Sequence, residues 1–326
     1  MSTFHDIIKA KTGLTPDEGR AAVITFRCSA ALSIIGSLLI LWDICKSGKI
    51  KKLCRLRLLT GVSVFDLLSS IANFMGPWAI EDKTGFKSEY FGVKAIGNHE
   101  TCQAQGFFTA MYLVSISYNL CLSMVYVITI KYSKGENWIK VKVEPWMHLY
   151  SLCYGVGVSL AMLPFGLNLY KEGLFACRVE IDKREVFVNA FYAAYTLIVM
   201  CLISILMVIL YVTVKKQENR VVKYTTQRFA SATSQSRKIA YQCFAFTASF
   251  YIVYIPFVVG NWSGLADPGS DHQFMFLMFR SLLFPLQGFL NAFVYFRPRL
   301  AKNMTVVAAR WTTSASSRRM GNGESG

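Results

Sequence analysis

The sequence predicts an all-α membrane protein built around a bundle of seven membrane-spanning helices, and three observations support this prediction. The chain of 326 residues is 53% hydrophobic with a mean hydropathy of +0.37, whereas charged residues make up only 17%. The apolar residues are gathered in runs of about 20, the length of helix that crosses a bilayer. The charged residues cluster between these runs. A soluble α/β domain would instead alternate short apolar strands with amphipathic helices.

Seven such runs can be placed along the chain, and no internal repeat divides them. We expect the spans at residues 20–44, 57–80, 103–130, 146–169, 188–214, 237–260 and 272–296. The first 19 residues have a mixed polar composition without an apolar core or a cleavage site. We therefore expect no cleavable signal peptide, and we expect the first span to direct insertion.

The charges between the spans predict which side of the membrane each loop occupies. The segments after spans one, three, five and seven carry about two thirds of the 35 Lys and Arg residues but only four of the 19 acidic residues. Basic residues beside spans stay cytoplasmic, so we expect the N-terminus outside and the C-terminus inside. The net charge of +16 then reflects a basic inner face that meets anionic lipid and acidic partners, and it requires no nucleic acid.

These predictions divide the chain into four parts. We expect an extracellular N-terminus at 1–19, the bundle at 20–296, an amphipathic cytoplasmic helix at 297–311 and a disordered tail at 312–326. The amphipathic helix is predicted by apolar residues at spacings of four, three and four, namely Leu300, Met304, Val307 and Trp311. The tail, TTSASSRRMGNGESG, has the composition of a disordered segment.

The cysteines sort by side of the membrane. Cys102 lies at the outer entry to span three, and Cys177 lies in the second outer loop. Because these two alone face an oxidising compartment, we expect them to form a disulfide; the alternative is two free thiols. The bridge would hold the loop over the mouth of the bundle.

Polar residues within the spans are few, and each needs a partner. Asp66 lies in span two, and Asn291 lies at a comparable depth in span seven. Ser123 or Asn119 of span three is expected to complete a polar cluster with them. This cluster is interpreted either as a switch between two helix arrangements or as a static knot that fixes helix register.

Span seven ends in PLQGFLNAFVYFRPRL, which contains several features of a helix that bends. Pro285 removes an intrahelical hydrogen bond, Gly288 permits a close helix contact, and Tyr295 lies one turn inward from Asn291. Gln287 adds a further polar group to the same segment, and Pro256 predicts a kink in span six.

Two arginines lie about two turns below the outer surface. Arg27 is in span one and Arg280 is in span seven. Either they face the bundle and form a basic site for an anionic ligand, or their guanidinium groups reach the outer interface. The remaining candidate ligand-binding residues are Arg178, Trp78, Tyr112 and Trp262.

Other motifs are sparse. Asn261 begins an Asn-Trp-Ser glycosylation sequon beside the membrane. The four histidines form no spaced metal-ligand set, and neither a phosphate-binding loop nor a nucleophile elbow occurs. We therefore expect no enzyme activity, no metal and no cofactor.

The pattern as a whole resembles the G-protein-coupled receptors over about residues 20–311. VSVFDLLSS resembles their second-helix pattern, which places their buried acid at Asp66. Span three, ending VYVITIKYSKG, lacks Asp-Arg-Tyr, and span seven lacks the Asn-Pro pair of rhodopsin-like receptors. PLQGFLNAFVYFRPR and the TCQAQGFF entry to span three are instead similar to the cAMP-receptor-like (class E) group, with a Gln-Gly feature shared by secretin-like receptors.

The resemblance implies a multi-pass plasma-membrane receptor that transmits a small-molecule signal, cAMP or another anion, to heterotrimeric G proteins. The inner ends of spans five and six would move apart to admit the G protein. The basic residues expected to contact it, or else lipid, are Arg55, Arg57, Lys140, Lys142, Lys215, Lys216, Arg237 and Lys238.

Two other classes of protein also have seven spans, and each makes a different demand on the sequence. A retinal protein needs a lysine in its last helix, and HQFMFLMFRSLLFPLQGFLNAFVYF contains none. A small transporter remains the alternative, although the two similar halves typical of such proteins are not apparent.

Overall fold

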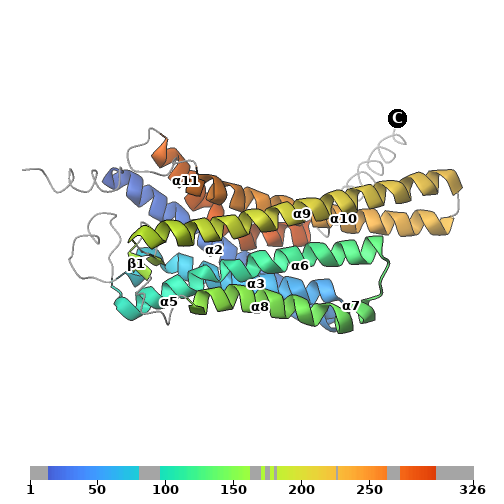
Figure 1. The fold of residues 1–326 in the computed structure, drawn as a ribbon, viewed down its shortest axis with the longest axis horizontal. Helices are drawn as coiled ribbons and strands as arrows, with labels where there is room; N and C mark the ends of the chain where they lie inside the picture. Colours follow the sequence, from blue (N-terminus) through green and yellow to red (C-terminus); the bar gives the residue numbers. More distant parts are fainter. Residues whose placement is uncertain are drawn as a thin grey trace, which may run out of the picture.

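The computed structural model describes residues 14–80, 96–161, 170–172, 177–179, 182–224, 227–262 and 272–298. Its long helices run side by side in one elongated bundle (Figure 1). They are α2 (Pro16–Ser47), α3 (Cys54–Met75), α5 (His99–Ala110) continuing into α6 (Tyr112–Lys131), α8 (Glu144–Ala161), α9 (Asp182–Tyr224), α10 (Gln227–Trp262) and α11 (Gln273–Leu283). After α11 the chain passes through η3 (Phe284–Leu286) into a final helix over 287–298. The ends of the bundle are called outer and inner according to the predicted orientation.

The shorter elements lie at the two ends of the bundle. They are η1 (Lys49–Lys51), η2 (Gly76–Ala79), α7 (Glu136–Lys142) and the antiparallel strands β1 (Tyr170–Glu172) and β2 (Cys177–Val179). The predicted all-α seven-helix bundle is therefore confirmed, with one small hairpin added in the second outer loop.

Within the described residues, six helical stretches are long and apolar enough to cross a membrane, namely Asp17–Ser47, Cys54–Ala79, His99–Lys131, Phe191–Arg220, Arg237–Gly260 and Gln273–Pro298. The predicted fourth span corresponds to α8. This helix is described only as far as Ala161, so its apolar continuation over 162–169 lies outside the described residues, as do the predicted amphipathic helix after Pro298 and the tail.

The first helix begins four residues before the predicted first span. α2 begins at Pro16, because Thr15 forms a capping box with Glu18. The Glu18 carboxylate accepts hydrogen bonds from the Thr15 backbone and hydroxyl, each at 2.8 Å. Proline at the first helical position also favours this start.

The residues between the predicted fifth and sixth spans, 215–236, are largely helical. α9 and α10 continue well beyond the predicted spans, to Tyr224 and from Gln227 respectively. They extend side by side past the inner ends of the other helices (Figure 1). Lys, Gln, Glu and Arg have high helix propensity, so the polar composition ends the membrane span without ending the helix.

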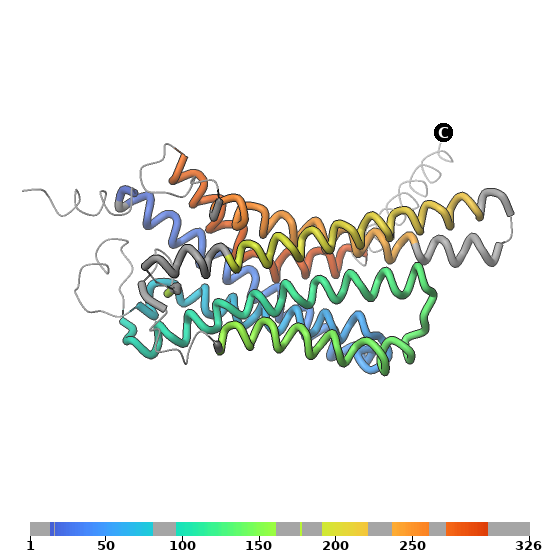
Figure 2. Tube along the Cα trace, in the orientation of Figure 1, coloured from blue at the N-terminus to red at the C-terminus, as the bar shows by residue number. Residues whose placement is uncertain are grey.

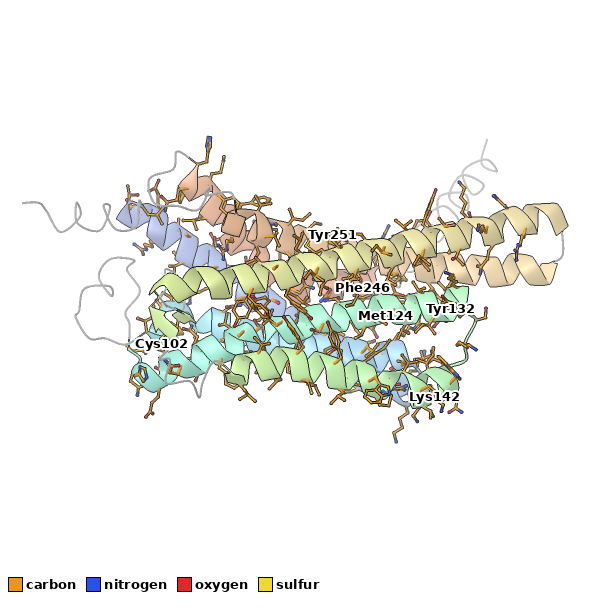
Figure 3. The ribbon with its side chains drawn as sticks, viewed as in Figure 1. Cys102, Met124, Tyr132, Lys142, Phe246 and Tyr251 are labelled. Atoms are coloured by element: carbon orange, nitrogen blue, oxygen red, sulfur yellow. A yellow bond between two sulfur atoms is a disulfide. The ribbon has the colours of Figure 1, made fainter. Side chains whose placement is uncertain are left out.

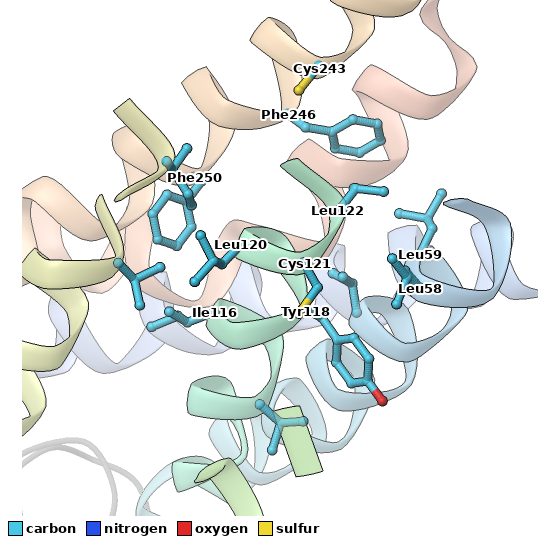
Figure 4. Close-up of a cluster of buried hydrophobic side chains, with 14 of the residues drawn as sticks. Leu58, Leu59, Ile116, Tyr118, Leu120, Cys121, Leu122, Cys243, Phe246 and Phe250 are labelled. Carbon is cyan, nitrogen blue, oxygen red and sulfur yellow. The ribbon is translucent and has the colours of Figure 1, made fainter. Parts of the chain in front are cut away.

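The third spanning helix forms the centre of the bundle. α6 is buried along nearly its whole length and packs against α3, α8, α9 and α10. Figure 4 shows part of this core, where Leu120 and Leu122 of α6 meet Phe246 and Phe250 of α10.

The first and last helices approach each other at backbone distance. α2 and the final helix lie together in the trace (Figure 2). A Cβ atom on Gly36 would lie 2.7 Å from the Gly288 carbonyl oxygen and from Phe289 Cα. One on Gly288 would lie 2.2 Å from Ser37 Oγ, so this contact requires glycine on both helices.

Candidate functional site

The predicted disulfide between Cys102 and Cys177 is present and fixes the outer hairpin to α5. Gln105, which the sequence analysis did not single out, reinforces it. Its Oε1 accepts from the Cys177 backbone N–H at 2.9 Å, and its Nε2 donates to the Ala72 and Gly76 carbonyl oxygens at 3.0 and 2.7 Å. The sequence signal for this role was a glutamine just inside the outer end of the predicted third span. Figure 3 places Cys102 at the outer end of the bundle, opposite Tyr132 and Lys142.

The structure divides the predicted ligand-binding residues between two places. The Arg27 guanidinium lies 3.6 Å from the Trp78 ring centroid, and its Nε donates to the Phe74 carbonyl oxygen at 3.0 Å. Arg27 thus binds the outer carboxyl end of α3, where a cation is favoured by the helix dipole. Trp78 remains 40% exposed and belongs to this outer rim.

The second place lies between α6, α10 and η3. Arg280 stands over the Phe257 ring, with 5.3 Å between the guanidinium carbon and the ring centroid. Phe257 packs edge-on against Tyr112, which also contacts Tyr254 and Phe284. The side chains of Arg178, Trp262 and Asn261 lie outside what the structure describes.

Asp66 joins three helices in the middle of the bundle. It is 4% exposed. Its Oδ1 accepts from Ser115 Oγ at 2.5 Å, and its Oδ2 accepts from Asn291 Nδ2 at 2.9 Å. The predicted proximity of Asp66 to Asn291 is therefore present, and the hydroxyl partner on the third helix is Ser115.

The expected partners Asn119 and Ser123 bond within α6 instead. Asn119 Nδ2 donates to the Ser115 carbonyl oxygen at 3.1 Å, and Ser123 Oγ donates to the Asn119 carbonyl oxygen at 3.0 Å. Ser115 lies one helical turn outward from Asn119 on the same face. The three residues share one face of α6, so the choice among them depends on the axial position of α6 relative to Asp66, which the sequence does not reveal.

The bend in the last helix creates a second polar contact. η3 surrounds Pro285, and the Gly288 N–H donates to Ser33 Oγ of α2 at 2.9 Å. Ser70 of α3 donates to the same oxygen at 2.8 Å. The disrupted backbone around proline thus supplies a donor that a regular helix would have used internally. Gln287 is 4% exposed, and its amide has no hydrogen-bond partner among the described residues.

Tyr295 connects the inner end of the last helix to the first helix. Its hydroxyl donates to Asp43 Oδ2 at 2.7 Å. Asp43 was not singled out from the sequence, although an acid within the apolar run LILWDIC was a signal of the same kind as Asp66.

Arg57 was predicted to contact a partner protein, and the structure instead pairs it inside the bundle. Its Nε and Nη2 donate to the Glu144 carboxylate of α8, with Nη2 and Oε2 2.6 Å apart. Its Nη1 donates to the Ile50 carbonyl oxygen at 2.8 Å. His148 Nε2 lies 3.6 Å from Glu144 Oε1, and His148 Nδ1 lies 2.9 Å from the Tyr118 hydroxyl. The side chains of Arg57 and Glu144 are only 18% and 8% exposed, so this cluster is structural.

Arg55, two residues earlier, lines a cavity of about 210 Å³ at the inner end of the bundle. The wall is formed by the inner ends of α2, α3, α6, α10 and the last helix together with η1, and it includes Ser47, Lys49, Arg55, Leu122, Tyr126, Gln242, Phe246 and Tyr295. Arg55 Nε is buried and has no hydrogen-bond partner among the described residues. The cavity therefore presents one guanidinium N–H that has no hydrogen-bond partner among the described residues.

A thin layer of side chains separates this cavity from Asn119 and Ser123 of α6. Leu122, Tyr126 and Phe246 line the cavity and also a void of about 10 Å³ that reaches Asn119 and Ser123. In Figure 4 the Phe246 ring lies beside Leu122, with Leu58 and Leu59 of α3 nearby. A shift of α10 that moves Phe246 would therefore change both the cavity and the neighbourhood of Asn119.

The other basic residues predicted at the inner face are exposed. They are Lys140 and Lys142 of α7, Lys215 and Lys216 of α9, and Arg237 and Lys238 of α10. Arg237 lies 3.9 Å from Glu218 across the α9–α10 pair, and Pro256 lies within α10 as expected. Among the described residues, no group of three or more His, Cys, Asp or Glu side chains is placed to hold a metal ion.

No family model matches the sequence, and no curated protein matches it. Among solved structures, the chain is similar to squid rhodopsin, with a TM-score of 0.65 and 13% sequence identity over 89% of this chain and 86% of that chain. An identity this low concerns the fold alone. The chain therefore has the seven-helix membrane fold seen in squid rhodopsin.

Proposed function

We propose that this protein is a plasma-membrane receptor that couples an extracellular small-molecule signal to a heterotrimeric G protein. The observation that carries the proposal is the inner cavity, where α2, α3, α6, α10 and the last helix surround Arg55, whose Nε is unpaired among the described residues. The shared fold and the resemblance of the span pattern to G-protein-coupled receptors support it.

The partner would bind at the inner cavity, which contains Arg55, and at the exposed basic residues of the inner face. A carboxylate from an inserted segment of the G protein would accept a hydrogen bond from Arg55 Nε, because a buried N–H without an acceptor costs free energy. Around it, the exposed Lys140, Lys142, Lys215 and Lys216 would attract an acidic surface, and Arg237 and Lys238 would contribute on α10.

The signal would pass through the contacts of the last helix. Binding outside and binding inside must favour the same arrangement of helices if they are coupled. The Asp66–Asn291 hydrogen bond, the bend at Pro285 and the contact of Tyr295 with Asp43 each connect that helix to its neighbours. In the proposed mechanism these contacts rearrange together.

The agonist is proposed to be an anion, with cAMP as the first candidate. Arg280 supports this choice because it faces the aromatic group around Phe257 on α10, the helix whose inner part lines the cavity. Arg27, which is engaged with the end of α3, is a weaker candidate.

The proposal is tested by guanine-nucleotide exchange on a panel of G proteins, using the protein in nanodiscs with and without cAMP and other small anions. Wild type should catalyse exchange, and Asn291→Ala should alter it because Asp66 loses a buried partner. Loss of the cAMP response in Arg280→Ala would support the anionic agonist. Absence of exchange with every G protein, together with solute flux through the same preparation, would contradict the receptor and favour a transporter.

A further inference from the structure

Gln105 lies where three parts of the outer end of the molecule meet. It is on α5, three residues after Cys102, and it is 2% exposed. Because residues three apart share one face of a helix, the Gln105 amide reaches the same hairpin strand that the disulfide holds. The hairpin is therefore attached to α5 at two neighbouring positions, through a covalent bond from Cys102 and a hydrogen bond from Cys177 to Gln105.

The Gln105 amide pairs backbone groups at the end of α3 and in the hairpin. Ala72 is among the last four residues of α3, whose carbonyl oxygens have no regular partner further along the helix, and Gly76 is the C-cap. Gln105 Nε2 donates to both of these carbonyl oxygens, at 3.0 and 2.7 Å. On the other side of the amide, Oε1 accepts from the Cys177 N–H at 2.9 Å. One side chain thus joins the end of α3 to the strand β2.

The three partners determine the orientation of this amide. Both protons of Nε2 are directed to carbonyl oxygens, whereas the lone pairs of Oε1 meet an N–H. A rotation of the amide by half a turn would set Oε1 against two carbonyl oxygens and Nε2 against an N–H, so all three contacts would become unfavourable. The contact therefore fixes the hairpin relative to α3 as well as to α5.

The end of α3 is itself held by its neighbours. Arg27 Nε of α2 donates to the Phe74 carbonyl oxygen at 3.0 Å. Thr101 Oγ1 of α5 donates to the Ala79 carbonyl oxygen of η2 at 3.0 Å. Gln105 thus connects the hairpin to a fixed part of the bundle, which neighbouring helices hold on either side.

Burial makes the contact with Gln105 costly to break. Cys177 is 1% exposed, and its backbone N–H is directed to the glutamine. A buried N–H that loses its acceptor, and two buried carbonyl oxygens that lose their donor, would each cost free energy. These costs do not depend on the bond between the two sulfur atoms, so they oppose movement of the hairpin whether the cysteines are oxidised or reduced.

We propose that Gln105 is a positioning residue that keeps the outer hairpin in place independently of the disulfide. The disulfide attaches the hairpin to α5 alone, whereas Gln105 attaches it to α5 and α3 together. The consequence for signalling rests on the proposed receptor function, because the hairpin lies at the outer end of the bundle, where an external agonist would enter. The position of the hairpin itself can be measured without an agonist.

The test is hydrogen exchange of the Cys177 backbone amide, followed by NMR in nanodiscs with isotopically labelled cysteine. In wild type, the exchange rate of this amide should change by less than about twofold when tris(2-carboxyethyl)phosphine reduces the disulfide. Gln105→Met keeps the length of the side chain but has no amide. Its Cys177 amide should exchange at least about fivefold faster than in wild type, the change expected for the loss of one hydrogen bond, and faster still after reduction.

Two controls separate this contact from the general stability of the bundle. Gln217→Met is the matched variant, because Gln217 Nε2 also donates to a backbone carbonyl oxygen, that of Ile130, at 3.3 Å near the inner end. It should leave the exchange of the Cys177 amide as in wild type. Cys121 and Cys243 are buried in α6 and α10, and their amides should stay protected in every sample.

Loss of protection at Cys177 in reduced wild type would overturn the proposal, because the disulfide alone would then hold the hairpin. Exchange at the wild-type rate in Gln105→Met would overturn it as well. If the amides of Cys121 and Cys243 also lose protection in Gln105→Met, the variant has unfolded, and the reduced wild type decides the question without it. The readout requires neither a G protein nor an agonist, so a failure here is distinguishable from a failure of the proposed receptor function.

Discussion

Arg55 and Arg57 lie two residues apart at the inner end of α3, yet their surroundings differ completely. Residues at this spacing point to opposite sides of a helix. Arg57 is paired with the Glu144 carboxylate and two backbone carbonyl oxygens. Arg55 lines the inner cavity with its Nε unpaired. The difference teaches that two neighbouring cations can have different surroundings: one is paired within the chain, and the other keeps an N–H that a bound partner would be able to use.

Arg57→Ala should have the largest effect on stability. It leaves Glu144 nearly buried without its cation, and breaking a buried pair in this way costs about 3 kcal/mol. Thermal unfolding in nanodiscs measures the loss. Arg57→Met combined with Glu144→Met should recover most of it, because no unpaired charge remains. An unchanged unfolding temperature in Arg57→Ala would refute the structural role.

Tyr295→Phe should have the next largest effect. It removes the hydrogen bond to Asp43 at the wall of the cavity, and a hydrogen bond to a charged acceptor contributes about 1.5 kcal/mol. We also expect basal nucleotide exchange to rise, because the last helix is released from α2. A variant destabilised to this extent with basal exchange still at the wild-type level would show that Tyr295 does not restrain the helix.

Tyr118→Phe tests whether the Tyr118–His148 contact belongs to the same network as the Arg57–Glu144 pair. The Tyr118 hydroxyl contacts His148 Nδ1 at 2.9 Å, and its loss should cost about 1 kcal/mol. Because His148 also lies near Glu144, a double-mutant cycle with Arg57→Met should reveal coupling between the two sites. Strict additivity would mean that the contacts act independently and form no network.

Arg55→Met should have the smallest effect on stability. Its Nε makes no hydrogen bond within the described chain, so we expect the unfolding temperature to stay the same or to rise slightly. A loss comparable to that of Arg57→Ala would mean that Arg55 has an intramolecular partner and that the two arginines are alike.

The sequence predicted the bundle well because a bilayer imposes a fixed length on apolar runs. The cysteine pair was predictable for a similar reason, since sidedness left two candidates. The inner ends of α9 and α10 lie beyond the predicted spans, because polar residues stop a membrane span while still favouring a helix.

The details of the site depended on the rotation and the axial position of each helix, which neither hydropathy nor charge counting reveals. The depths of Asp66 and Asn291 were sufficient to predict their contact, but the choice of Ser115 over Asn119 or Ser123 was not predictable. In the same way, counting basic residues treated Arg55 and Arg57 as equivalent. Packing against α8 distinguishes them, because Glu144 lies on the side that Arg57 faces.

The most direct test of the central claim is the initial rate of guanine-nucleotide exchange catalysed by Arg55→Gln in nanodiscs. Lys46→Gln is the control, because Lys46 lies over the Trp42 ring of α2 and does not line the cavity. We predict that Arg55→Gln lowers the rate at least about tenfold, the equivalent of 1.4 kcal/mol, with unchanged stability, while Lys46→Gln matches wild type. Equal rates for all three proteins would contradict a partner that binds Arg55 in the inner cavity.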